Sequence, residues 1–528
     1  MASSLANDLA KTALDCYSAF PERGKPSRRT NGAPERTVLA AFLVFREADE
    51  GSGGPHEVRC VSIGTGLKAL PHARLPLHGD VLHDSHAEVI ARRGFKVWMY
   101  GELSRAGHGD KASLLERFER DDGKAEWRFK AGWRVGMYVS TLPCGDASTY
   151  FLALQSSAGE SIVDAAPSVS AVPPPLASDA LSSASAPSSA SAPALHPSLS
   201  TSLSLGLSLS RNPSLSPSGV LRGRNSYTSL STLRTKPGRA DSPPTTSHSC
   251  SDKLALWNLC GVQGGLLSAL GVARVPLAVV VVGAEGVLQQ EREKVREEIS
   301  RALGGRLEAW ARKIGLGKQY FEVPKVEWTE REYVHGREAV ARREGVEREA
   351  VVGCAESLSY VASATPAVEV ITNGIRQGAS SKRKPAEALG AKNRSRLCKL
   401  SLFQKHLEVQ AKIAPAFPLA SPNDTVAASS SSPLTYFSAK HLSPLSPSPI
   451  AVAGVSDTLP TLSPPRRYQL LKSLVRRRAS PSASSDAETM QEADAKGGDG
   501  PFAGWLASGE RWESFDGEGR VVEHGGAV

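Results

Sequence analysis

The sequence predicts an α/β fold, with a central mixed sheet flanked by helices and interrupted by long low-complexity inserts. Short runs rich in Val, Leu and Phe alternate along the chain with segments of helical apolar spacing, which is typical of α/β domains. The apolar segments on either side of each insert are too short to build separate cores. We therefore expect one domain over residues 37–515, preceded by an N-terminal extension (1–36) and followed by a C-terminal tail (516–528).

In the first third of the chain, strands are indicated where β-branched and aromatic residues crowd together and the run ends in Gly or charge. Helices are indicated where apolar residues recur at three- and four-residue spacing. The expected elements are a helix over Leu5–Phe20, strands over Thr37–Arg46 and Glu57–Ile63, a helix over His86–Leu103, a strand over Trp133–Thr141 and a helix over Cys144–Leu154.

Order is expected to resume near Leu233. The continuous apolar run Pro276–Val282 predicts a strand that is buried on both faces. The other expected elements are helices over Leu254–Leu270, Gln289–Ile314, 395–412 and Arg466–Arg478, a strand over Ala367–Asn373, and an ordered tail over Pro501–Phe515.

Four inserts are expected to be disordered because they contain few large apolar side chains. Residues 181–210 hold 12 Ser and no charged residue, and such composition cannot offset the entropy cost of ordering. The inserts are predicted at about 156–232, 414–433, 441–465 and 479–500.

Composition limits the classes of function. The 63 Lys+Arg against 54 Asp+Glu leave a net charge of +9, which mildly favours an anionic partner. Seven irregularly spaced cysteines are typical of a reducing compartment, where a few thiols bind metal. No secretory signal or membrane-spanning run is evident, so we expect an intracellular soluble protein of the nucleus or cytoplasm, with no membrane and no obligate protein partner.

Two short motifs predict a zinc centre. Asp84-Ser85-His86-Ala87-Glu88 stands at the head of an expected helix, and Leu142-Pro143-Cys144-Gly145-Asp146 follows an expected strand. Zinc deaminases of nucleobases combine H-x-E with P-C-x-x-C, where one His and two Cys bind the metal and the Glu transfers protons.

The second thiolate is displaced in this chain, because the position three after Cys144 is Ala147. Cys250 is favoured, since it directly precedes an expected helix and Lys253 adds positive charge; both stabilise a thiolate. Cys260 falls inside an apolar helix and is better explained as a core residue. The remaining candidates are Cys16, Cys60, Cys354 and Cys398.

These motifs together resemble the family of adenosine deaminases that act on RNA and tRNA. Supporting matches include Gly64-Thr65-Gly66-Leu67-Lys68, Arg234-Thr235-Lys236-Pro237-Gly238-Arg239, Ser249-Cys250-Ser251-Asp252-Lys253, Gly261-Val262-Gln263-Gly264 and Gly504-Trp505-Leu506. The resemblance implies a cytidine-deaminase-like core and hydrolytic deamination of adenosine to inosine. It assigns His86, Cys144 and Cys250 to Zn²⁺ and Glu88 to proton transfer.

Within that family the chain resembles the tRNA branch, because about 36 residues before the first strand leave no room for a double-stranded RNA-binding domain. The implied target is adenosine 37, next to the anticodon of alanine tRNA. The alternatives are A-to-I editing of double-stranded RNA or mRNA, a retired deaminase that only binds RNA, and a free-nucleoside or cytidine deaminase. The presence of Glu88 argues against a deaminase that has lost its activity. The displaced second cysteine argues against an enzyme of free nucleosides.

The resemblance also implies a buried inositol hexakisphosphate. Buried cations without partners are costly, and a shared polyanion would explain Arg and Lys in apolar segments. The implied contacts are Lys68, Arg92, Arg93, Lys253, Trp257, Gln263, Lys399, Tyr436, Lys440, Tyr468, Lys472 and Trp505. By the same analogy Asp84, Lys236 and Lys253 form a polar relay from the polyphosphate to the metal ligand Cys250.

Overall fold

The computed structural model describes residues 3–48, 56–157, 220–222, 229–236, 242–318, 320–362, 364–380, 382, 387–414, 434–441, 455–477, 499–506 and 509–522. A mixed eight-stranded sheet forms its centre, which confirms the predicted α/β class. The strand order is β12 (Lys325–Thr329), β11 (Val279–Gly283), β8 (Arg134–Val139), β2 (Leu39–Arg46), β3 (Glu57–Thr65), β14 (Glu356–Val361), β15 (Val368–Thr372) and β16 (Ile375–Arg376). The β12–β11–β8 pairs are parallel, and all other neighbours are antiparallel.

The central strands are apolar on both faces because helices cover both sides. In β2, Phe42 and Val44 face one apolar cluster whereas Leu43 and Phe45 face the other, as the two-residue period of a strand requires. Helix α2 (Ala87–Gly107) packs on the first side, and helix α1 (Ser4–Ser18) packs on the second. The predicted N-terminal extension therefore contributes a helix to the core.

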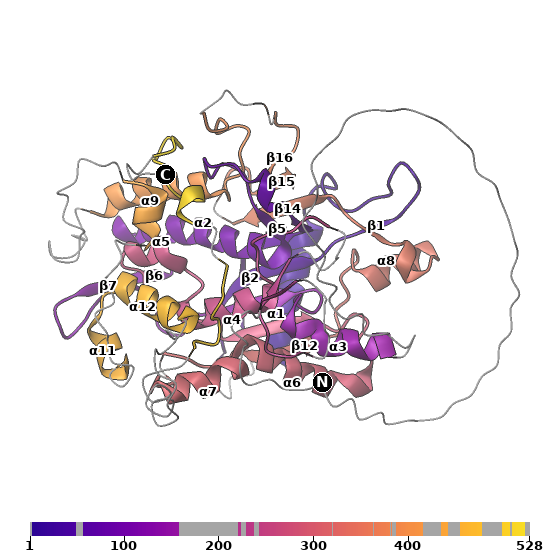
Figure 1. The fold of residues 1–528 in the computed structure, drawn as a ribbon, viewed down its shortest axis with the longest axis horizontal. Helices are drawn as coiled ribbons and strands as arrows, with labels where there is room; N and C mark the ends of the chain where they lie inside the picture. The colour runs from indigo at the N-terminus through magenta and orange to yellow at the C-terminus, as the bar shows by residue number, and fades with distance from the viewer. Residues whose placement is uncertain are drawn as a thin grey trace, which may run out of the picture.

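Further helices surround the sheet (Figure 1). They are α3 (Asp146–Ser157), α4 (Cys250–Cys260), α5 (Gly264–Ala269), α6 (Arg292–Ser300), α7 (Arg306–Lys313), α8 (Arg337–Glu344), α9 (Lys399–Ile413), α10 (Tyr436–His441), α11 (Val455–Thr461) and α12 (Pro464–Arg476). Helix α9 lies alongside α2, and α12 packs against α4 and α5.

Short strand pairs and single turns complete the fold. The pairs are β1 (Glu35–Arg36) with β13 (Val352–Gly353), β4 (Leu67–Ala69) with β5 (Asp84–His86), β6 (Leu115–Glu119) with β7 (Ala125–Phe129), and β9 (Leu221–Arg222) with β10 (Arg234–Thr235). The short turns are η1 (His72–Arg74), η2 (Gln289–Glu291), η3 (Arg301–Gly305), η4 (Arg348–Ala350) and η6 (Glu510–Trp512).

The predicted elements are found with changes at three places. The helix expected over Leu254–Leu270 is two helices, because Gly261 ends α4 with a φ of 97°. The helix expected over Gln289–Ile314 is interrupted by the π-turn η3 between α6 and α7. Within the insert expected at 441–465, α11 is helical and its Val455 and Leu459 are buried.

The structure also extends beyond the expected limits of the domain. Strand β9 lies inside the insert expected at 156–232, and the tail expected from 516 is described as far as Val522, whose N–H binds Ser514 O at 2.9 Å. In the described residues no helix has the length and apolarity that a membrane crossing needs.

Candidate active site

The catalytic motifs meet where β5 passes into α2. His86 occupies the N-cap of α2 with extended backbone, and Glu88 lies buried in the first turn. The start of this helix lies close against β3, because a Cβ on Gly64 would stand 2.4 Å from the Ala87 carbonyl oxygen. Only glycine permits that approach, which carries both side chains to the end of the sheet.

The two cysteines come together although they are 106 residues apart in the chain. Cys144 follows β8, and Cys250 is the first residue of α4. The Cys250 N–H donates to Cys144 Sγ at 3.3 Å, and Ser251 N–H donates to the Cys144 carbonyl at 3.0 Å. Gly145 has a φ of 99°, and any Cβ there would meet Ser249 Oγ at 2.2 Å. The segment after Cys144 is therefore fitted closely against the N-terminus of α4.

The pKa values of the two thiols shift in opposite directions. A hydrogen bond from Cys250 lowers the pKa of Cys144 to about 6, against burial and with help from Lys236 and His86. Burial and the neighbouring Cys144 sulfur raise the pKa of Cys250. Cys144 is therefore the sulfur that ionises first.

Asp84 is the centre of a buried polar network. Its Oδ2 accepts from Lys236 Nζ at 2.8 Å and from Lys253 Nζ and Ser247 Oγ at 2.5 Å. Its Oδ1 accepts from His86 Nδ1 at 2.8 Å. Burial opposes ionisation, but the two ammonium groups and the imidazole hold the pKa of the Asp84 carboxyl well below its ordinary value.

Lys236 connects this network to the cysteine pair. Its Nζ also lies 3.2 Å from Cys250 Sγ. Burial favours the neutral amine, yet the charges of Asp84 and Cys250 raise the pKa of Lys236. The three residues proposed as a relay are thus in direct contact, and the residues 237–240 that continue the Lys236 motif lie outside the described residues.

The donor chemistry at this point fits zinc. An imidazole whose Nδ1 is held by a carboxylate presents Nε2 outward, as zinc-binding histidines do, and Lys236 Nζ links the same carboxylate to Cys250 Sγ. Within the described ranges no three His, Cys, Asp or Glu side chains stand close enough to form a complete metal centre as they are.

Five of the predicted cations form, with two further residues, a largely enclosed cationic cluster that includes one face of α2. We define it as Arg92, Arg93, Lys96, Lys399, Lys440, Lys472 and Arg476. The Arg92 guanidinium lies 4.5 Å from the Trp257 ring centroid and donates to Val262 O at 2.9 Å. Glu513 is the carboxylate within it, 3.0 Å from Lys399 Nζ and 2.6 Å from Lys440 Nζ.

The charges of this cluster are poorly balanced. Burial and repulsion among its own cations lower the pKa of Lys96 well below the ordinary lysine value. Burial lowers the pKa of Arg92 to about 10 and of Lys399 to about 8. Each of these shifts shows a cation that lacks sufficient negative charge nearby.

Three of the remaining predicted contacts are aromatic residues that lie beside the cations of the cluster. Lys440 Nζ lies over the Tyr436 ring, Lys472 Nζ lies over the Tyr468 ring, and Arg476 lies 4.4 Å from the Trp505 centroid, so the aromatic residues line the cluster.

Two predicted contacts are placed differently. Lys68 lies exposed on β4, opposite Ser85, and is not among the cluster residues. Gln263 is buried, and its amide already bonds Ser268 Oγ and the Val275 N–H at 3.0 Å each. Its role in the structure is to hold the turn after α4.

Sequence reasoning missed Lys96, Arg476 and Glu513. Lys96 stands four residues after Arg92 on α2, and that spacing would have placed both on one helix face. Glu513 carries no local signal, because Lys440 is 73 residues away in the chain.

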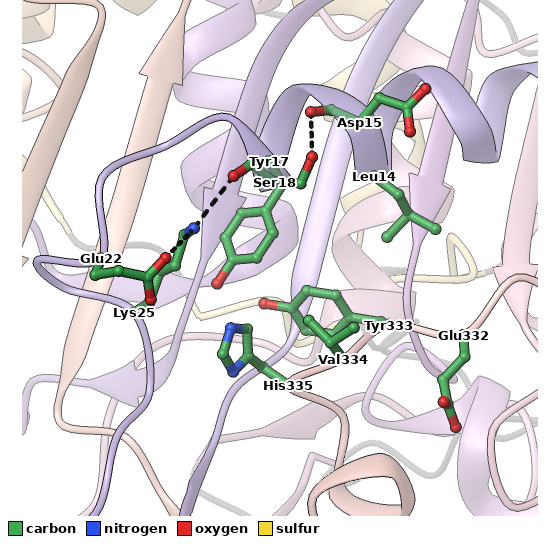
Figure 2. A pocket seen from close by; sticks show the side chains of 10 residues that line it. All are labelled: Leu14, Asp15, Tyr17, Ser18, Glu22, Lys25, Glu332, Tyr333, Val334 and His335. Atoms are coloured by element: carbon green, nitrogen blue, oxygen red, sulfur yellow. Dashed lines mark hydrogen bonds and ion pairs between the residues drawn. The ribbon is translucent and has the colours of Figure 1, made fainter.

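A cavity of about 320 Å³ lies on the opposite side of the sheet (Figure 2). The rings of Tyr17, Tyr333 and His335 meet edge to face there, and Lys25 Nζ pairs with Glu22 at 2.9 Å. None of the predicted site residues lines it.

Comparison with known proteins gives a consistent result. The family model of the adenosine-deaminase (editase) domain matches residues 62–444. The mouse and human proteins named tRNA-specific adenosine deaminase 1 are 27% and 26% identical over 76% and 78% of this chain, and the alignments cover 87% and 89% of those proteins. The Saccharomyces cerevisiae protein of the same name is 27% identical over 48% of this chain, and that match spans about half, 52%, of its length.

Proposed function

Since this chain belongs to the adenosine-deaminase (editase) domain family, we propose that it deaminates adenosine to inosine in tRNA, at adenosine 37 of alanine tRNA. The relatives named tRNA-specific adenosine deaminase 1 support the choice of tRNA. An anticodon loop is single-stranded, so its bases are reached at less unstacking cost than bases in a duplex.

His86, Cys144 and Cys250 would hold a zinc ion. The orientation of His86 by Asp84 and the contact of the two sulfurs support that assignment. When bound, zinc supplies a Lewis acid that makes water a nucleophile at neutral pH.

The chain's own groups perform the proton transfers and the positioning. Glu88, buried in the first turn of α2, would take the proton of the attacking water and deliver protons to N1 of the base and to the departing ammonia. Asp84 fixes the His86 ring, and Lys236 places positive charge beside Cys250. The balanced reaction converts adenosine and water to inosine and ammonia.

The cationic cluster is the proposed site of inositol hexakisphosphate. Seven cations gather around one carboxylate, and the lowered pKa values of Lys96, Lys399 and Lys472 support the need for an anion there. The ligand would reach the catalytic network through Lys253, which binds both Asp84 and Ser247.

The observation that carries the proposed function is the buried network in which Asp84 contacts His86 and Lys236, and Lys236 contacts Cys250 of the cysteine pair, in a chain of this family. The test compares an alanine tRNA transcript, the same transcript with guanosine at position 37, a long RNA duplex and free adenosine. We expect inosine only in the first.

Glu88→Gln is the matched catalytic control, because it keeps the size of the side chain and removes its base. It should bind tRNA and zinc as the parent protein does but yield no inosine. Inosine formed only in the duplex would replace the proposal with double-stranded RNA editing. Absence of inosine from every substrate with zinc present would leave an RNA-binding protein.

A further inference from the structure

Each cysteine of the pair is followed, two positions later, by a fully buried aspartate. Asp146 begins α3, and Asp252 lies in the first turn of α4. Asp252 Oδ2 accepts from Arg234 N–H at 3.0 Å and from the hydroxyl of Ser249 at 2.7 Å, and Ser249 is the N-cap of α4. Asp252 Oδ1 and the carboxylate of Asp146 lie instead against Arg301 and Arg306.

Arg301 fastens Asp146. Its two terminal nitrogens lie 2.8 and 3.2 Å from the two Asp146 oxygens, the bidentate geometry that guanidinium and carboxylate favour. Arg301 also donates to Ser231 Oγ at 2.8 Å, and Ser231 N–H donates to Asp146 Oδ1 at 2.9 Å. The same contact therefore binds the segment in which the chain returns toward Cys250.

Arg306 contacts both aspartates. Its Nη2 lies 2.8 Å from Asp252 Oδ1, and its Nη1 lies 3.6 Å from Asp146 Oδ2. Only 4% of the side chain is exposed, and its guanidinium lies over the Phe502 ring at 4.8 Å. The two carboxylates offset the cost of burying this charge as ion pairs.

The π-turn η3 explains why two arginines five residues apart act together. In an α-helix, residues five apart are rotated by about 140° and point in different directions. Here Arg306 N–H donates to Arg301 O, which closes the wider turn and aligns the two side chains. The turn packs against α3 and α4, the helices that follow the two cysteines (Figure 1).

We propose that Arg301 and Arg306 are positioning residues that hold the Cys144 and Cys250 segments in register for metal binding, through Asp146 and Asp252. The inference rests on the proposed zinc function, but it concerns contacts that form without the metal. Cys144 precedes α3 and Cys250 begins α4, 106 residues later in the chain, so ionic contacts between their two segments fix their separation before zinc arrives.

The test measures zinc release to a chromogenic chelator at a temperature well below unfolding, for Arg306→Lys, Arg301→Lys and Asp252→Asn. We expect release about tenfold faster or more, the size of effect seen when partners of metal ligands are removed. Arg306→Lys with Asp252→Asn should release zinc little faster than either single variant, because both remove one contact. Cobalt-loaded variants should show altered visible absorption bands, which report the geometry around the metal.

Arg274→Lys is the matched control. Arg274 is also a buried arginine, but it binds Leu259 O and Asn258 O at the opposite end of α4. It should lose stability in urea unfolding while zinc release stays at the parental rate. The inference is wrong if the Arg301, Arg306 and Asp252 variants lose stability as the control does but release zinc at the parental rate. Their cobalt-loaded forms would then also show unaltered absorption bands.

Failure of the proposed function is distinguishable. Parental protein that holds no stoichiometric zinc would remove that proposal itself. Parental protein that holds zinc and deaminates tRNA, with variants that retain zinc equally, would remove only the inference.

Discussion

Lys472 provides a sharp test of whether the cationic cluster is built for an anion. Burial, followed by repulsion from Lys440 and Arg476, lowers the pKa of Lys472 from the ordinary value of 10.5 to about 7, and Glu513 offsets only part of this. The difference corresponds to about 4 to 5 kcal/mol of free energy. The side chain keeps some contact with solvent, so about 4 kcal/mol is an upper bound.

Replacing Lys472 with Met should therefore act in opposite directions with and without ligand. At pH 7 the ligand-free variant should unfold at a higher urea concentration than the parent. Its free energy of unfolding should be larger by up to about 4 kcal/mol. Inositol hexakisphosphate at 1,000 times its Kd should stabilise the parent by about 4 kcal/mol. At the same ligand concentration the variant should gain less, because one of the charges that bind the phosphates is absent.

The pH dependence of the ligand-free parent has a definite sign. Folded Lys472 loses its proton near pH 7, whereas unfolded lysine loses it near 10.5. Between these values the unfolded state binds more protons at this site, so Lys472 alone should make stability rise with pH by about 1.4 kcal/mol per pH unit, and Lys96, whose pKa is also lowered, adds to the rise. Lys399, with a folded pKa of about 8, adds to the rise above that pH. Cys260 and Tyr468 have raised pKa values in the folded state, so they oppose this rise only where the unfolded thiol and phenol ionise, from about pH 9 upward.

The assay is urea unfolding followed by tryptophan fluorescence, at pH 7 and 9, with and without ligand. Lys405→Met is the control, since Lys405 is partly exposed and pairs only with Glu408; its effect should stay within about 0.5 kcal/mol. The reasoning is refuted if Lys472→Met destabilises the ligand-free protein, or if ligand stabilises the variant as much as the parent.

Three further predictions follow from other contacts. Asp84→Asn leaves two buried ammonium groups without their carboxylate and should cost about 3 to 5 kcal/mol in urea unfolding; a cost under 1 kcal/mol would contradict the network. Gly145→Ala places a methyl group against Ser249 and should release zinc faster to a chelator, unlike Gly109→Ala, where the added Cβ meets nothing within 4 Å. Glu513→Gln should destabilise the ligand-free protein yet raise its affinity for inositol hexakisphosphate in calorimetry, because the carboxylate competes with phosphate for two lysines; weaker binding would oppose that account.

Local patterns predicted much of the sheet and the motifs. The apolar run that contains β11 predicted a strand buried on both faces, and in the structure Val280 and Val282 face one apolar cluster whereas Val279 and Val281 face the other, to which α1 belongs. Strand β14 escaped prediction because Ser357 and Ser359 are buried within it and conceal its apolar pattern. The break at Gly261 is legible in the sequence, since glycine ends helices readily, whereas nothing local marks the π-turn beyond two adjacent glycines.

Candidate site residues could be named from the sequence where a motif is short, and could not be named where the partners are distant in the chain. His86, Glu88 and Cys144 stand in compact motifs, while the partner cysteine had to be chosen from six. The contact of Cys250 with Cys144 supports that choice. The positioning role proposed for Arg301 and Arg306 could not be predicted from the sequence. It depends on the π-turn and on two aspartates that are more than 50 residues away in the chain.

The burial of α1 has a consequence for where the cooperative unit of this protein begins and ends. The family match starts at residue 62, inside β3, and stops at 444, yet Leu9 and Ala13 of α1 fill one face of the sheet and Phe515 closes the far end of the chain. A fragment trimmed to the matched boundaries would lack the central strand β2 as well as Glu513. The matched family domain is therefore shorter than the part of the chain that packs into one core. An expression fragment cut at residues 62 and 444 would expose apolar surface that α1, β2 and the C-terminal segment bury in the full chain.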